Sequence, residues 1–377
     1  MSHPLPYGVF ATPDDPRPRT GVAVGDRVLD LPATVAALDP SFAPVVAGPS
    51  LDALLAAGPS VWAALRAALT GWVDAEAPVV WATDPSMRLP FTVADYVDFY
   101  ASEQHATTIG RIFRPDQEPL TPNWRHLPIG YHGRAGTVVV SGTEIVRPSG
   151  QRRGPDGPVF GPSQRLDIEV ELGYVVGTPS RLGEPVPLDR FAEHVFGVCL
   201  VNDWSARDIQ AWEYVPLGPF LGKSFATSVS PWVVPLAAFD HARVPAPERT
   251  EALLPYLDDA ETEPWGLDIR FEVRLNGHLI SEPVFGGMYW TGPQMLAHLT
   301  VNGASLRTGD LYASGTVSGG SPGSLIELTW NGRDPLTLPD GTTRTFLADG
   351  DEVVISATAP GPGGSVINLG SVIGRIS

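Results

Sequence analysis

The stretch Leu166-Asp167-Ile168-Glu169-Val170-Glu171-Leu172 alternates apolar and acidic residues without a break. Successive side chains of a β-strand point to opposite faces, so this stretch predicts a strand with one apolar face and one acidic face. Asp167, Glu169 and Glu171 would share the acidic face, with about 6–7 Å between one and the next. A divalent cation would neutralise carboxylates stacked in this way. The alternative is an exposed strand whose acidic face is solvated.

The sequence around this stretch predicts a mainly β protein. With 40 glycines and 39 prolines, turn signals recur every few residues and leave short periodic segments between them. Turn-forming residues at 83–90 predict a boundary between a small domain, 1–90, and a larger one, 91–377. Besides 166–176, we expect strands at 22–24, 27–30, 137–141, 196–201, 230–234, 269–275, 324–330 and 352–357. We expect helices within 51–74 and at 103–112, 188–194, 204–213 and 291–299.

Composition narrows the function classes. Hydrophobic residues make up 43% of the chain and charged residues 18%, which is enough apolar material for a sizeable core. The formal net charge of -17 argues against nucleic acid or an anionic membrane as a partner, although most of the excess is explained by solvated surface acids. Cys199 is the single cysteine, so no intramolecular disulfide can form. We expect a cytoplasmic protein without a signal peptide or membrane span.

A second polar group follows the apolar segment 196–201. Asp203 stands at its end, and Ser205 is placed to cap a helix that carries Arg207 and Gln210 three residues apart on one face. This junction would present a carboxylate, a cation and an amide together. The alternative is an ordinary helix cap with a solvent-facing Arg–Asp pair.

Lys223 is the one lysine among 25 basic residues, the other 24 being arginine. Drift toward arginine would have been free to replace a surface lysine, so we expect this compact ammonium group to occupy a tight site. The neighbouring glycines suggest a phosphate loop. However, only three residues separate Gly218 from Gly222, so we expect no nucleotide site.

Two further side chains suggest acid–base chemistry. His105 follows an acid and a phenol within a few residues, although a lone histidine is more often structural. Glu327 lies in the apolar segment Leu325-Ile326-Glu327-Leu328, which we expect to be a strand. A carboxylate in such a setting must be paired or ion-bound, and its pKa would be perturbed.

Four blocks of the sequence, at 98–107, 122–134, 202–210 and 212–225, resemble in content and order those of the fumarylacetoacetate hydrolase family. The resemblance implies a small N-terminal SH3-like barrel, a larger C-terminal mixed β-roll and a homodimer. It also implies metal-dependent hydrolysis of a carbon–carbon bond in 4-fumarylacetoacetate to fumarate and acetoacetate, the last step of tyrosine and phenylalanine breakdown. The alternatives are a related acylpyruvate hydrolase and a non-catalytic metal-binding dimerisation module.

The resemblance also assigns roles to single residues. The implied ligands of Mg²⁺ or Ca²⁺ are Asp98, Glu169, Glu171 and Asp203, flanked by Lys223 and Thr227. His105 would be the general base, tuned by Glu327. The implied oxyanion donors are Arg207, Gln210 and Lys223. The implied contacts to a diketo-acid substrate are Tyr100, Arg114, Tyr131, Gln210, Tyr214 and Thr316.

Overall fold

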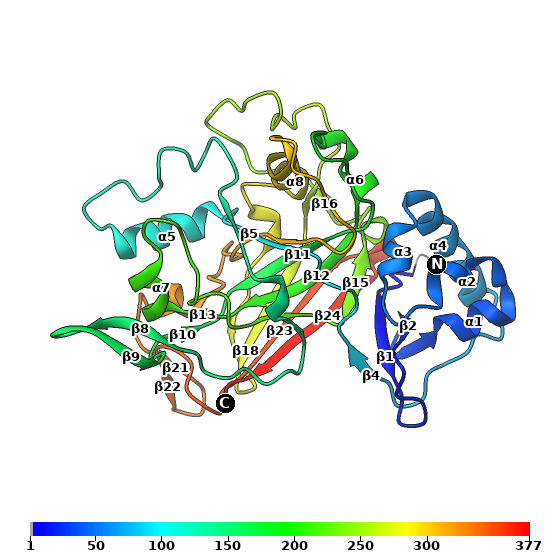
Figure 1. The fold of residues 1–377 in the computed structure, drawn as a ribbon, viewed down its shortest axis with the longest axis horizontal. Coiled ribbons are helices and arrows are strands. Elements are labelled where there is room, and N and C mark those ends of the chain that lie inside the picture. Colours follow the sequence, from blue (N-terminus) through cyan, green and yellow to red (C-terminus); the bar gives the residue numbers. More distant parts are fainter. Residues whose placement is uncertain (1–2) are drawn as a thin grey trace.

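The computed structural model describes residues 3–377 and is built around one large sheet (Figure 1). Within those residues the sheet has 12 strands. Its main path runs β3 (Arg27–Asp30), β2 (Arg19–Val24), β1 (Tyr7–Ala11), β15 (Trp232–Pro235), β12 (Val195–Asp203), β11 (Val170–Val176), β20 (Leu311–Ala313), β5 (Tyr96–Phe99) and β6 (Gly130–His132). Off this path, β4 (Ser86–Arg88) pairs with β1, and β14 (Thr227–Val229) pairs with β12 and with β7 (Val138–Val140).

Smaller sheets surround the large one. A four-stranded sheet has the order β19 (His278–Ser281), β18 (Arg270–Leu275), β23 (Glu352–Pro360) and β24 (Val366–Arg375). The two-stranded pairs are β8 (Ser149–Gly154) with β9 (Gly157–Pro162), β10 (Leu166–Asp167) with β13 (Ser205–Ala206), β16 (Arg243–Val244) with β17 (Gly266–Leu267), and β21 (Leu336–Thr337) with β22 (Thr343–Arg344). Burial differs between the sheets: every residue of β11 and β12 is buried, whereas β23 alternates between buried and more exposed positions.

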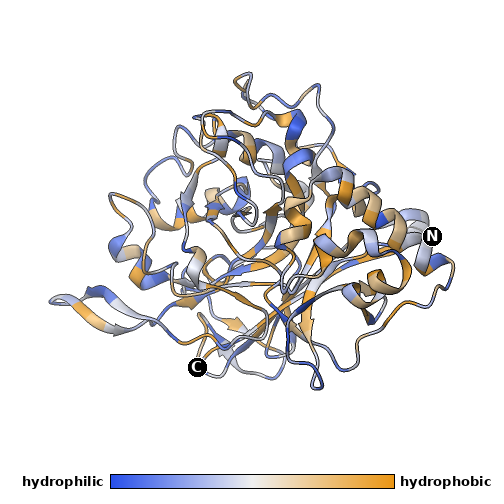
Figure 2. Ribbon diagram, turned by 45° about the vertical axis from the view of Figure 1, so that its right-hand side comes forward, coloured by the Kyte–Doolittle hydropathy of each residue, from blue (hydrophilic) through white to orange (hydrophobic). Residues whose placement is uncertain are grey.

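Helices cover the sheets and the N-terminal strands. They are α1 (Leu31–Leu38), α2 (Ala43–Val46), α3 (Asp52–Ala56), α4 (Pro59–Asp74), α5 (Glu103–Phe113), α6 (Phe191–His194), α7 (Arg207–Glu213), α8 (Gly292–Thr300) and α9 (Leu325–Leu328). Figure 2 shows hydrophobic residues concentrated on the central strands. None of the helices within 3–377 combines the length and the hydropathy that crossing a bilayer requires.

The N-terminal strands continue into the large sheet. Strand β1 pairs with β2 and β4 and also with β15, where Tyr7 lies opposite Val233. On the other side of this region, Leu29 bridges Trp81, and the Asp30 amide donates to the Val80 carbonyl at 2.8 Å. The strand pairings described here do not close a barrel, so the SH3-like barrel and the boundary at residue 90 remain predictions.

Several expected elements are confirmed. The hairpin of β2 and β3 forms, as do the helices expected within 51–74 and near 103–112, 188–194, 204–213 and 291–299. The strands expected at 269–275 and 352–357 are β18 and β23.

Three local expectations are wrong. The strand expected at 166–176 is interrupted between β10 and β11, so Asp167 does not continue the acidic face of Glu169 and Glu171. The strand expected at 324–330 is the short helix α9. Ser205 does not cap α7, since it lies in β13 opposite Asp167, and the capping position belongs to Ala206.

Candidate active site

Four acidic side chains converge at the middle of the large sheet. Glu171 lies on β11 and Glu169 just before it, while Asp203 ends the neighbouring strand β12. Asp98 comes from β5, which reaches β11 through β20, where Ala313 lies opposite Asp98. Each carboxylate offers an oxygen within 4.8 Å of the others, and all four residues are buried. The sheet therefore brings together the four metal ligands that the family resemblance implies.

The electrostatics of this cluster fit a divalent cation. Burial, followed by repulsion from Asp203, raises the pKa of Asp98 well above its usual range, and burial and Asp98 do the same for the pKa of Glu171. Both carboxylate oxygens of Glu171 and Oδ1 of Asp98 are buried without a hydrogen-bond partner among the described residues. Unpaired buried carboxylates are costly, and a hard cation that prefers oxygen ligands would satisfy them.

Lys223 lies against two of the carboxylates. Its buried Nζ donates to Glu169 Oε2 and, at 2.7 Å, to Asp203 Oδ2. Burial works against its charge, but Asp203 and Glu169 raise the pKa of Lys223 above its usual range, so the ammonium form persists. Gly222 allows this approach, because a Cβ there would lie 2.7 Å from the backbone nitrogen of Gln210. Thr227 Oγ1 donates to the other oxygen of Asp203, Oδ1, at 2.9 Å.

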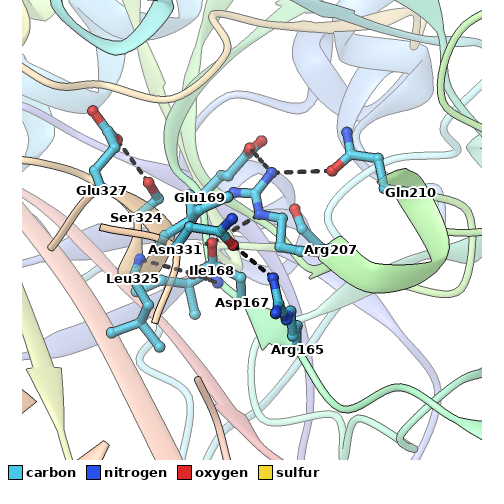
Figure 3. A network of polar contacts seen from close by, with 12 residues as sticks. Arg165, Asp167, Ile168, Glu169, Arg207, Gln210, Ser324, Leu325, Glu327 and Asn331 are labelled. Atoms are coloured by element: carbon cyan, nitrogen blue, oxygen red, sulfur yellow. Dashed lines mark hydrogen bonds and ion pairs between the residues drawn. The ribbon is translucent and has the colours of Figure 1, made fainter. Parts of the chain in front are cut away.

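Arg207 is held on three sides by acceptors (Figure 3). Its Nε donates to Asp167 Oδ2 at 2.8 Å, and its Nη1 donates to Gln210 Oε1 at 3.2 Å and pairs with Glu169 Oε1 at 2.8 Å. Its Nη2 is buried and has no partner in the described part of the chain. Burial opposes ionisation of Glu169, but Lys223 and Arg207 together hold the pKa of that carboxyl below its usual range.

His105 and Glu327 form a buried pair. Ser102 caps α5 by accepting from the His105 amide at 3.2 Å, which places the imidazole one turn into the helix. His105 Nδ1 lies 2.7 Å from Glu327 Oε2, and Ser318 and Ser324 donate to the same oxygen at 2.8 and 2.6 Å. Burial opposes ionisation of Glu327, but the imidazole and these hydrogen bonds lower its pKa. An anionic Glu327 would orient the imidazole so that Nε2 can accept a proton.

Of the residues expected to contact the substrate, some lie against the carboxylates or His105 and others do not. Tyr131 donates its hydroxyl to Asp203 Oδ2 at 3.2 Å, and the Tyr100 ring meets His105 edge-on at a centroid distance of 5.3 Å. The Thr316 hydroxyl is buried without a partner within residues 3–377. In contrast, Arg114 ends α5 and donates to the Pro119 carbonyl at 2.7 Å, and Tyr214 is 45% exposed at the end of α7. No contact described here joins these last two to the carboxylates.

Sequence reasoning missed the two serines that hold Glu327. Ser318 and Ser324 lie in a segment of glycines and hydroxyl residues, which predicts only a flexible loop. It also missed the true role of Asp167, whose carboxylate contacts Arg207 instead of the metal-ligand set. Asp167 leaves no spacing signal, because Arg207 lies 40 residues away in the sequence. Ser318 and Ser324 lie only 9 and 3 residues before Glu327, but the strand expected at 324–330 hid the helical turn that brings Ser324 to this carboxylate.

Two family models together match residues 3–377. Residues 3–95 match the fumarylacetoacetase N-terminal domain and residues 95–377 the fumarylacetoacetate hydrolase C-terminal domain. The chain belongs to the fumarylacetoacetate hydrolase family. It is 46% identical over 401 residues to fumarylacetoacetase from Homo sapiens, covering 99% of this chain and 95% of that protein. It is 44% identical over 398 residues to fumarylacetoacetase from Arabidopsis thaliana, covering 99% and 94%. This family membership makes the chain an enzyme of the hydrolase class.

Solved structures share the fold of the family at lower identity. Fumarylacetoacetate hydrolase from psychrophilic Exiguobacterium antarcticum superposes with a TM-score of 0.59 at 20% identity, covering 99% of both chains. Maleylpyruvate hydrolase from Sphingobium sp. SYK-6, in complex with manganese(II) ion and pyruvate, gives a TM-score of 0.55 at 15% identity, covering 99% of this chain and 100% of that one. At these identities the likeness supports the fold alone.

Proposed function

We propose that this protein hydrolyses 4-fumarylacetoacetate to fumarate and acetoacetate, the last step of tyrosine and phenylalanine breakdown. The full-length relatives at 44–46% identity that carry the name fumarylacetoacetase support this substrate. The observation that carries the proposal is the set of buried carboxylates contacted by Lys223 and Arg207, together with the His105–Glu327 pair, whose imidazole lies near enough to Glu169 to lower the pKa of that carboxyl. A non-catalytic metal-binding module would have no use for a buried imidazole–carboxylate pair beside the acidic cluster.

Asp98, Glu169, Glu171 and Asp203 would hold Mg²⁺ or Ca²⁺, with Lys223 and Thr227 fixing the orientation of two of these carboxylates. When bound, such a cation supplies Lewis-acid polarisation of the substrate carbonyl. Strand pairing brings these carboxylates together from distant parts of the chain.

His105 would act as the general base. Glu327 fixes Nδ1, and Nε2 would take a proton from water as the water oxygen attacks the carbonyl carbon. Nη2 of Arg207, which has no partner within residues 3–377, the amide of Gln210 and the ammonium of Lys223 would donate to the oxyanion that develops. When the carbon–carbon bond breaks, the bonding electrons leave with the acetoacetate carbanion. The proton held at His105 Nε2 can return to that carbon, which closes the balance of atoms and charge.

The ends of the substrate would meet residues around this centre. We assign these contacts to Tyr100, Arg114, Tyr131, Gln210, Tyr214 and Thr316. Arg114 is the cation of this set and suits a substrate carboxylate. Because Arg114 and Tyr214 lie outside the contacts of the metal-ligand cluster, they would serve the substrate ends and not the reacting carbon.

We also make proposals about the domain organisation, the oligomeric state and the cellular location of the protein. Backbone hydrogen bonds join residues 80–82 to 28–30, and β4 pairs with β1, an arrangement that favours an SH3-like barrel in residues 1–90 followed by a β-roll domain in 91–377. We further propose a homodimer located in the cytoplasm, in line with the single, buried Cys199. Sedimentation of the purified protein would give its oligomeric state.

The test of function is a turnover assay. Loss of the absorbance of fumarylacetoacetate should depend on added Mg²⁺ or Ca²⁺ and should yield fumarate and acetoacetate in equal amounts. A parallel series of acylpyruvates tests the competing substrate class. A kcat/KM higher for any acylpyruvate than for fumarylacetoacetate would contradict the proposed substrate while leaving the hydrolase assignment intact.

A further inference from the structure

Asp167 lies between the two halves of the proposed active site and belongs to neither of them. Its side chain is fully buried, with 0% of its surface exposed. The break between β10 and β11 takes it out of the acidic face, and it is not one of the carboxylates that converge within 4.8 Å. The role of Asp167 therefore follows from the groups that donate hydrogen bonds to its two carboxylate oxygens.

On one side Asp167 fixes Arg207. The antiparallel pairing of β10 with β13 sets Asp167 opposite Ser205, two residues before Arg207, and Asp167 Oδ2 accepts from Arg207 Nε at 2.8 Å. Glu169 and Gln210 occupy Nη1 of the same guanidinium. These contacts set the plane of the guanidinium. Nη2 is left as a buried donor that has no partner in the described chain, so it is the nitrogen of Arg207 available to an oxyanion.

On the other side Asp167 caps α9. The first amides of a helix have no partner within the helix, and the Ser324 side chain makes no capping hydrogen bond here. Instead, Asp167 Oδ1 accepts from the Leu325 amide at 2.7 Å and Oδ2 accepts from the Ile326 amide at 3.0 Å, although Asp167 lies 158 residues before Leu325 in the chain. Figure 3 shows Leu325 and Asp167 beside Arg207. Glu327, the partner of His105, is the next residue of this helix.

We infer that Asp167 is a positioning residue that holds the oxyanion donor Arg207 and the base pair His105–Glu327 in one frame. The inference rests on the proposed function and adds to it a residue that touches neither metal-ligand carboxylates nor substrate. A single carboxylate accepts from both sides, so a shift of α9 displaces the guanidinium as well. Asparagine has the same shape but carries a donor nitrogen, which must face Arg207 Nε–H or a helix amide and break one side of the frame.

The first measurement is a comparison of two isosteric variants. Asp167→Asn should lower kcat roughly 10- to 100-fold, the usual effect of removing a group that orients a catalytic one, while KM stays within about threefold and Mg²⁺ affinity is unchanged. The matched control is Asp351→Asn. Asp351 is 2% exposed and accepts from Arg344, Asn276 and the Ala348 amide, none of them a proposed site residue. This control should lose thermal stability comparably but keep the parental kcat.

The second measurement does not depend on turnover. Hydrogen exchange of the amides in residues 318–330 should be faster in Asp167→Asn than in the parent or in Asp351→Asn. If Asp167→Asn fails to fold, Asp167→Ser, which leaves room for water, replaces it with the same expectations. Unchanged kcat, a fall in kcat together with loss of Mg²⁺ affinity, or unchanged exchange over 318–330 would each overturn the inference. If the parent fails to cleave fumarylacetoacetate, the proposed function fails, while the exchange result still decides whether Asp167 positions α9.

Discussion

Replacing Glu327 by glutamine isolates the effect of its charge on the general base. All three donors, from His105, Ser318 and Ser324, converge on Oε2, while Oε1 is buried without a partner among the residues described. In Glu327→Gln the amide oxygen can keep the Oε2 position and the amide nitrogen can take the place of Oε1. The hydrogen bonds then persist, and the negative charge beside the imidazole is lost.

The magnitude follows from Coulomb attraction. When His105 Nε2 accepts a proton, the imidazolium charge is spread over two nitrogens. We therefore take about 4 Å as the mean distance between this positive charge and the carboxylate charge of Glu327. At an effective dielectric constant of about 20, this attraction is worth about 4 kcal/mol. Because about 1.36 kcal/mol corresponds to a factor of ten in rate, kcat should fall about 10³-fold. This value lies inside the range of about 10²- to 10⁴-fold measured for general base catalysis elsewhere.

The assay is the steady-state disappearance of fumarylacetoacetate at saturating Mg²⁺, with Mg²⁺ affinity measured separately by calorimetry. Glu193→Gln is the control, since Glu193 pairs with Arg190 at the surface and should keep parental kcat. His105→Ala should lose at least as much turnover as Glu327→Gln, and the double variant should be little worse than the worse single one. A Glu327→Gln enzyme within threefold of parental kcat would refute the reasoning, as would additive losses in the double variant.

Three further predictions concern the acidic cluster and its lysine. Lys223→Arg should lower kcat at least about 100-fold, because a planar guanidinium cannot donate to both Glu169 and Asp203 from the same volume. Steady-state kinetic constants near the parental values would show that the lone lysine is not required for catalysis. Glu171→Gln should abolish calorimetrically detected Mg²⁺ binding, and parental affinity would mean that the metal binds elsewhere. The raised pKa values of Asp98 and Glu171 keep protons on the metal-free protein at pH values where ordinary carboxyls are ionised. Their contribution to stability is therefore present at low pH and lost as pH rises through the raised pKa values, so the Tm of the metal-free protein should fall with rising pH. Mg²⁺ binding should release protons and should stabilise the folded protein more at higher pH. Calorimetry in buffers of different ionisation enthalpy would detect the release, and its absence would contradict the assigned protonation.

The sequence predicted the acidic cluster better than its surroundings. Alternation over residues 169–171, at the start of β11, is a short-range pattern, so Glu169 and Glu171 could be paired from the sequence alone. Asp98 and Asp203 required the family motifs, because only the pairing order of β5, β20, β11 and β12 brings them to the same place.

Glu327 shows where the sequence pattern fails. A run of four apolar and acidic residues is too short to distinguish a strand from a helical turn by periodicity. The helix is settled instead by Asp167, which supplies acceptors for the amides of Leu325 and Ile326. Local sequence carries no trace of a cap that comes from so far away in the chain, and for the same reason the alternation at 166–171 wrongly assigned Asp167 to the metal face.

The position of β20 in the large sheet sets the order in which the metal site can assemble on the ribosome. Asp98 is synthesised early, and Glu171 and Asp203 follow on β11 and β12, which pair directly with each other. However, β20 lies between β11 and β5, so Asp98 has no strand to hold it beside Glu171 until residues 311–313 have emerged. A nascent chain shorter than this contains all four carboxylates but lacks the strand that joins β5 to β11, so their convergence has to wait for the last part of the chain.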